Sequence, residues 1–201
     1  MLKIVSYLFA LAVVVSLVAC GGGAGNGKDV SSYSTKIAKY AGAKDLKSLQ
    51  SLGDTIIADE TLGEDVVKQL NDTTAEISSA ALAVSVSPEK AANIIFEYVK
   101  SMKKEDKPIL RARVKSLLNW YSDMKQDDKS KKFRETLDSL ALSLDIDKQA
   151  QCYVMVATSP AFLAGMVKAE GGENKEELIK AIEKAYSDNE AELTQFRNAL
   201  K

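Results

Sequence analysis

The sequence predicts an all-α protein, built as a closed bundle of about six to eight helices. Only three of the 201 residues are proline, and five of the eleven glycines lie between residues 21 and 27. The remainder is rich in Ala, Leu, Lys and Glu, which are strong helix formers. Apolar residues recur at steps of three and four, whereas no sustained alternation predicts a sheet. A closed bundle is favoured over a solenoid because no 34-residue repeat is present.

The first expected helices span residues 33–40, 45–58 and 61–86. Thr61 and Glu64 have the spacing of a capping box, in which the two side chains bond to backbone amides of the first turn. We therefore expect the third helix to begin at Thr61. Its residues from Ser78 to Ala83 are small, which would let a neighbouring helix approach closely.

The later expected helices span residues 88–104, 108–125 and 130–144, followed by a segment capped by Asp145 or Asp147 and a last helix or pair of helices over 174–200. Ser87 is expected to cap the helix that Pro88 begins, since proline at the first position loses no needed hydrogen bond. The nearly all-apolar run 152–167 predicts a helix at the centre of the bundle, kinked or restarted at Pro160. Asn174 is expected to cap the next helix, and residues 187–189 to interrupt it.

The first 19 residues have the layout of a secretory signal peptide. Lys3 precedes an apolar run from Ile4 to Ala19, and a small residue stands before Cys20. This run of 16 residues is shorter than the roughly 20 that a membrane-spanning helix needs. Leu17-Val18-Ala19-Cys20 resembles the lipobox of bacterial lipoprotein precursors. The resemblance implies that Cys20 receives a diacylglycerol, that cleavage occurs just before it, and that the lipid anchors the mature protein to a membrane.

Three segments follow from this interpretation: a lipoprotein signal peptide (1–19), a lipidated cysteine with a flexible Gly/Ser tether (20–32), and one helical domain (33–201). In lipoprotein sorting of the enteric type, an Asp directly after the cysteine retains the protein in the inner membrane. Gly21 stands there instead. The expected location is therefore the cell envelope, on the outer membrane and facing the periplasm.

The residues that commonly carry catalysis are scarce. The chain has no histidine, so it lacks the commonest general base and the most versatile metal ligand. Lipidation of Cys20 would leave Cys152 as the only thiol of the mature domain, which excludes a disulfide within it and zinc sites of the Cys/His kind. We expect Cys152 to pack as a small buried hydrophobe, the alternative being a reactive thiol. No enzyme activity, cofactor or metal is expected.

Basic residues are concentrated between Lys100 and Arg134, where twelve Lys or Arg face five Asp or Glu, a net charge of +7. Six of them would gather near the turn of a helical hairpin: Lys100, Lys103, Lys104, Lys107, Arg111 and Arg113. One interpretation is a solvated face with local ion pairs. The other is a surface for an anionic partner, either phospholipid or lipopolysaccharide headgroups or an acidic protein. Nucleic acid is not expected as a partner, because the mature chain is net acidic and has no recognisable binding motif.

Two functions remain open on these observations. The favoured one is a membrane-anchored lipoprotein with a non-enzymatic interaction or structural role, which docks a partner through the basic hairpin. The alternative is a lipoprotein carrier that binds an apolar or amphipathic small ligand inside the bundle. The candidate cavity residues for the carrier are Met102, Trp120, Met124, Tyr153, Met155 and Met166. An apolar cavity of several hundred cubic ångströms would favour the carrier, and a close-packed interior would oppose it.

Overall fold

The computed structural model describes residues 30–71, 73–170, 172 and 174–201. These residues contain no strand, which confirms the all-α class. The helices are α2 (Val30–Ala43), α3 (Leu46–Ile57), α4 (Glu60–Gln69), α5 (Ala75–Ser85), α6 (Pro88–Ser101), the short 3-10 helix η1 (Lys104–Asp106), α7 (Lys107–Asp123), α8 (Asp127–Ala141), α9 (Ile146–Val156), α10 (Pro160–Glu170), α11 (Lys175–Ala185) and α12 (Glu190–Leu200). The expected number of six to eight helices is wrong, since the described residues alone form eleven α-helices. The signal peptide, Cys20 and the tether up to residue 29 lie outside the described residues.

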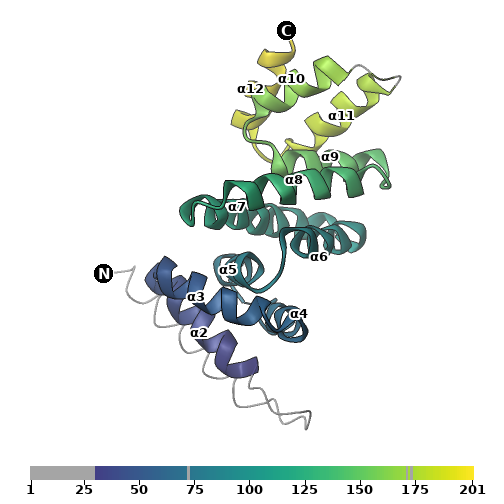
Figure 1. Cartoon of the computed structure of the whole chain (residues 1–201). Helices are drawn as coiled ribbons and strands as arrows, with labels where there is room; N and C mark the ends of the chain where they lie inside the picture. Colours follow the sequence, from purple (N-terminus) through teal and green to yellow (C-terminus); the bar gives the residue numbers. More distant parts are fainter. Residues whose placement is uncertain (1–29, 72, 171, 173) are drawn as a thin grey trace.

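The helices pack in successive layers, which run from α2 and α3 at one end of the molecule to α10, α11 and α12 at the other (Figure 1). The most extensive contacts join each helix to the next but one: α3 to α5, α5 to α7, α6 to α8, α9 to α11 and α10 to α12. The helices do pack together as a bundle requires. Because contacts pass from layer to layer, however, the bundle is elongated, whereas the sequence favoured helices closed around one core.

Two hydrophobic clusters fill the interior of the described region. The larger joins helices α2 to α9 and includes Tyr121 and Phe133, whose ring centroids lie 6.4 Å apart. The smaller joins α9 to α12 and includes Tyr186 and Phe196, at 5.8 Å. Tyr153 of α9 packs against both clusters. Helix α9 therefore links the two halves of the stack.

Helix α5 lies at the centre of the larger half, and its residues Ser78–Ser85 are all buried. A Cβ atom added to Gly53 of α3 would lie 2.7 Å from the carbonyl oxygen of Val84, and one added to Gly63 of α4 only 2.2 Å from that of Ser85. On the other side, the Ser79 hydroxyl donates to the Arg113 carbonyl of α7 at 2.8 Å. The predicted close approach to this small-residue segment is therefore confirmed.

The helix expected over residues 61–86 is in fact two helices, α4 and α5. The hydroxyls of Ser78 and Thr73 both donate to the Leu70 carbonyl, at 2.6 and 2.5 Å. Thr74 then caps α5 by accepting the Ile77 amide at 3.4 Å. Short polar side chains offer the backbone such alternatives to a continuous helix, and here they end one helix and begin the next.

The expected helix caps are confirmed in part. Ser87 and Asp145 accept first-turn amides at 3.3 and 3.0 Å, as their sequence context predicts. The capping box of Thr61 and Glu64 is wrong, because α4 begins one residue earlier with Asp59 as its cap residue. The Thr61 hydroxyl donates instead to Asp59 Oδ1 at 2.7 Å.

The apolar run 152–167 is divided at Pro160 into α9 and α10, so the chain restarts there. Its first part is buried, as expected, with Cys152 fully covered. Its second part is not at the centre of the molecule: α10 lies in the outermost layers, and Phe162 is 54% exposed. The predicted interruption at residues 187–189 is confirmed, with Asn189 capping α12 by accepting the Glu192 amide at 3.2 Å.

Candidate functional site

Arg111 is one of the six basic residues expected at a docking surface, but it forms contacts within the domain. Its guanidinium donates to Asp188 Oδ1 at 3.1 Å and to the Ala185 carbonyl. Its side chain is 19% exposed. Arg111 therefore joins α7 to the turn between α11 and α12, two layers further along the stack.

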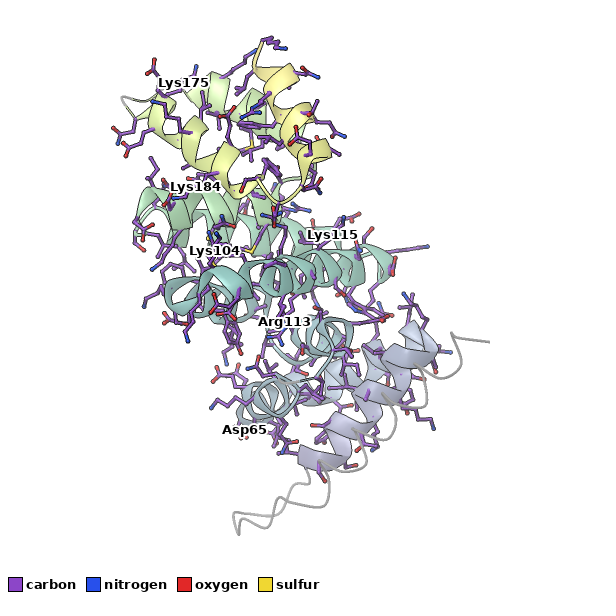
Figure 2. The ribbon with its side chains drawn as sticks, turned by 180° about the vertical axis from the view of Figure 1, so that it is seen from behind. Asp65, Lys104, Arg113, Lys115, Lys175 and Lys184 are labelled. Atoms are coloured by element: carbon purple, nitrogen blue, oxygen red, sulfur yellow. The ribbon has the colours of Figure 1, made fainter. Side chains whose placement is uncertain are left out.

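Arg113 likewise forms contacts within the domain, in the opposite direction. It donates from Nη1 to Asn71 Oδ1 at 3.0 Å and from Nη2 to the Asn71 carbonyl. The Tyr98 hydroxyl donates to the same Oδ1. Figure 2 shows Arg113 at the boundary between α7 and the layer that contains α5. Both arginines thus serve the packing of layers and are not presented together to solvent.

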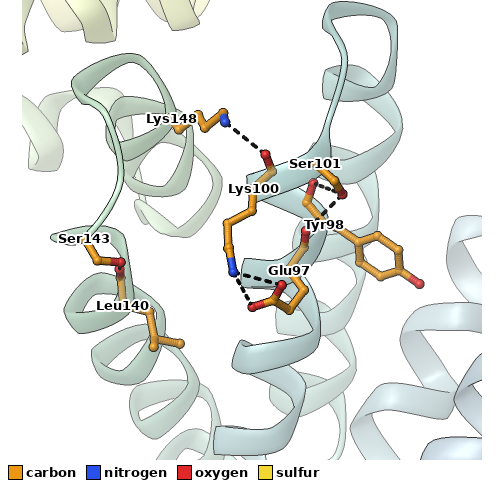
Figure 3. Close-up of polar contacts among 7 residues, drawn as sticks. All are labelled: Glu97, Tyr98, Lys100, Ser101, Leu140, Ser143 and Lys148. Carbon is orange, nitrogen blue, oxygen red and sulfur yellow. Dashed lines mark hydrogen bonds and ion pairs between the residues drawn. The ribbon is translucent and has the colours of Figure 1, made fainter.

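Lys100 is held by a neighbour on its own helix (Figure 3). Its ammonium donates to both carboxylate oxygens of Glu97, at 3.0 and 3.1 Å, and lies 5.3 Å from the centroid of the Phe96 ring. Its carbonyl accepts a hydrogen bond of 2.9 Å from Lys148 of α9. Lys100 is therefore a surface lysine whose ion pair lies within its own helix, α6.

Three lysines remain at the connection between α6 and α7, and we call Lys103, Lys104 and Lys107 the basic turn. Lys103 and Lys104 are exposed and Lys107 is half-buried, and none forms an ion pair with another described residue. The Asp106 carboxylate accepts the Lys103 backbone amide at 2.9 Å. With Glu105 and Asp106 counted, residues 103–107 carry three positive and two negative charges, a net of +1. The exposed basic surface thus has three lysines, whereas the sequence predicted six basic residues there.

The six candidate cavity residues do not line a single cavity. Trp120, Met124 and Met155 are buried within the larger hydrophobic cluster. Met102 lines a recess of about 290 Å³ beside Arg113. Only Tyr153 and Met166 line the same opening, which lies between α8 and α10.

That opening, which we call the α8–α10 groove, has a volume of about 670 Å³. The end of α9 forms its floor. Its α10 side is apolar, with Phe162, Leu163, Met166 and Val167. Its α8 side carries Asp127, Ser130, Lys131, Arg134, Glu135 and Asp138 and ends at Leu142, just after the helix. Leu142 is 69% exposed and Phe162 54%, which makes them two of the three exposed large hydrophobic residues in the described chain. Sequence reasoning missed this groove because it placed the whole run 152–167 inside.

A second groove, of about 740 Å³, lies between α4 and α6. An ion pair of 3.9 Å between Lys90 and Glu64 links the two helices across it. Val67 and Ile94 supply apolar surface, with Lys68 and Glu97 at the rim. Its charges are thus matched locally, and no exposed large hydrophobic residue lies in it.

Cys152 is fully buried in the larger cluster. Burial, together with the negative charge of Asp138, raises the pKa of its thiol to about 12. Burial also lowers the pKa of Arg134 on the groove wall, an effect that Asp138 opposes. A thiol with so high a pKa stays protonated near neutral pH and is a poor nucleophile, which supports the structural interpretation of Cys152.

Among the described residues, no three or more acidic or cysteine side chains are grouped so that they could hold a metal ion. No helix in this part of the chain is long and apolar enough to cross a membrane. No family model matches the chain, and neither a curated protein nor a solved structure gives a significant match.

Proposed function

We propose that this protein is a lipoprotein of the bacterial cell envelope with a non-enzymatic binding role. The N-terminal sequence supports the anchor, because an apolar leader ends at a lipobox-like tetrad with Cys20 as its last residue. Two or three acyl chains on one cysteine would hold the protein durably at a membrane, since each buried methylene contributes about 0.8 kcal/mol. The tether that the sequence predicts over residues 20–32 would then keep the helical domain close to the bilayer, on the periplasmic face of the outer membrane.

The observation that carries the binding role is the exposure of the basic turn. Lys103 and Lys104 extend from η1, and neither has an ion-pair partner among the described residues. Ammonium groups without local ion-pair partners attract anionic groups. The partner proposed for this surface is therefore anionic.

Affinity purification from native membranes, after mild cross-linking, tests this role. The variant K103Q/K104Q/K107Q removes the basic turn but leaves Arg111 and Arg113 in place. The control K39Q/K47Q/K180Q removes three exposed lysines from other helices and has the same net charge. A partner that is recovered with the wild type and the control, but lost with the first variant, would support docking through the basic turn. Equal recovery with all three proteins would contradict it.

The carrier remains a second candidate because of the α8–α10 groove. Its volume of about 670 Å³ lies in the range of small-molecule sites, and its lining includes Tyr153 and Met166. Trp120, Met124 and Met155 instead belong to close-packed core. The groove is thus a more open site than the enclosed cavity that a carrier was expected to have.

A further inference from the structure

We propose that the α8–α10 groove binds an amphipathic α-helix of a partner protein. This surface shares no residue with the basic turn, so the inference does not depend on docking there. Helices α6 and α8 form one of the closest pairs in the molecule, as do α10 and α12, yet α8 and α10 make no extensive contact. The groove thus lies where α8 and α10 are neighbours without extensive helix–helix contact.

The dimensions of the groove suit a helix. Its lining begins at Asp127, the first residue of α8, and continues to Leu142, just after the last. At a rise of 1.5 Å per residue, this stretch is about 22 Å long, which corresponds to about four helical turns. A partner helix lying along α8 would therefore contact the groove over its whole length.

One wall of the groove is apolar and the other is charged, so the walls match the apolar and polar faces of an amphipathic helix. The α10 wall presents Phe162 and Met166, while the facing surface of α8 presents charged side chains such as Lys131 and Glu135. A helix with apolar residues at spacings of three and four can cover the α10 wall and keep its polar edge against α8. A small apolar ligand would instead cover charged groups without hydrogen-bonding them, which is unfavourable.

The charges on α8 indicate which charge the partner helix should carry. Lys131 lies 3.9 Å from Glu135, and Arg134 is electrostatically coupled to Asp138. The α8 wall has three acidic residues, Asp127, Glu135 and Asp138, against the basic Lys131 and Arg134, a net charge of −1, and Asp127 is exposed at the start of α8. The partner helix is therefore expected to place a Lys or Arg at the end that lies beside Asp127.

Leu142 and Phe162 are the expected anchors of the interface, since both are large, apolar and already exposed. Aromatic residues near the centre of an interface commonly carry most of the binding energy. Because neither side chain is part of the buried core, replacing one with a charged residue should leave the fold intact. The third exposed large hydrophobic residue, Ile109, lies outside the groove and provides a matched control.

The test uses the full mature chain from residue 20 with Cys20→Ser, so that no attached acyl chain can enter the groove. The probe is a fluorescent 15-residue helical peptide with Leu at positions i, i+3, i+4, i+7 and i+11 and Lys along one polar edge. We expect saturable binding by this chain and by its Ile109→Asp variant, and at least tenfold weaker binding by Phe162→Asp. Asp127→Asn should weaken binding about threefold.

Four results would overturn the proposal. The peptide could fail to bind, or Phe162→Asp could bind it as tightly as Ile109→Asp does. Palmitate could bind saturably and displace the peptide, which would assign the groove to a small ligand. Sedimentation could show a dimer that Phe162→Asp abolishes, which would assign the groove to a second copy of this chain.

Discussion

Arg113 of α7 donates a hydrogen bond from Nη1 to Asn71 Oδ1 over 3.0 Å, and thereby ties α7 to the turn between α4 and α5. The same guanidinium reaches the Asn71 carbonyl, and Tyr98 of α6 donates to the same amide oxygen. Helices α6 and α7 thus both contact the turn between α4 and α5 at one asparagine. A residue that the charge pattern assigned to a docking surface is in this way part of the packing between layers.

Replacing Arg113 with Gln should lower the free energy of unfolding by about 2 kcal/mol, because hydrogen bonds to a charged donor are lost and the groups of Asn71 lose their partner. Lys115→Gln, on the same helix, removes the same charge from an exposed position and should change stability by less than about 0.5 kcal/mol. Urea unfolding followed by circular dichroism measures both. Equal stability of the two variants would show that Arg113 does not join the layers.

Gly63→Ala should destabilise the protein by about 1–3 kcal/mol, because the new Cβ would lie 2.2 Å from the Ser85 carbonyl oxygen and force α4 away from α5. Gly165→Ala is the matched control. Gly165 also lies within a helix but has no neighbouring atom within 4 Å of the added Cβ, so this variant should gain up to about 1 kcal/mol from helix propensity. Thermal unfolding would test whether Gly63→Ala lowers and Gly165→Ala raises the stability of the protein. A stabilised Gly63→Ala would contradict the close packing at α5.

Cys152 should react with a thiol reagent only after the protein unfolds. Its side chain is fully buried, and the pKa of about 12 leaves almost no thiolate at pH 8. The measurement is the rate of colour development with an aromatic disulfide, in the Cys20→Ser background, with and without denaturant. Reaction of the folded protein at the rate of the unfolded chain would show that the thiol is accessible.

The same thiol should make the fold less stable in alkaline solution. The pKa of Cys152 is raised from about 9 to about 12 on folding, so the folded state holds the proton more tightly. This contribution is complete below about pH 9 and is lost as the pH rises towards 12. Cys152→Ala, although less stable overall, should lose less stability between pH 8 and pH 10 than its parent does. If urea unfolding showed that both proteins lose the same stability between these pH values, the loss would not arise from Cys152.

Two helix caps that depend only on local sequence were predicted correctly. Ser87 and Asp145 cap helices through amides three residues away, so their neighbours in sequence suffice to identify them. The break between α4 and α5 was missed because it depends on Ser78 reaching back eight residues to the Leu70 carbonyl. The layered arrangement was also missed, since it is set by contacts between helices that are not consecutive in the chain.

The candidate sites were harder to predict for the same reason. The partners of Arg113 and Arg111 lie 42 and 77 residues away in sequence, so the charge pattern could not separate internal arginines from exposed lysines. Phe162 belongs to an apolar run that reads as fully buried, and its exposure follows only from the spacing between α8 and α10.

The proposed lipidation of Cys20 would determine where this protein acts, and intact-mass spectrometry of the protein purified from its native membranes tests it most directly. We predict a chain that begins at residue 20 and carries the added mass of a diacylglycerol, with or without a further acyl chain, on the fragment that contains Cys20. Cys20→Ser should abolish this mass and release the protein from the membrane fraction. A mature N-terminus elsewhere, or an unmodified Cys20 in the membrane-bound protein, would contradict the proposed anchor.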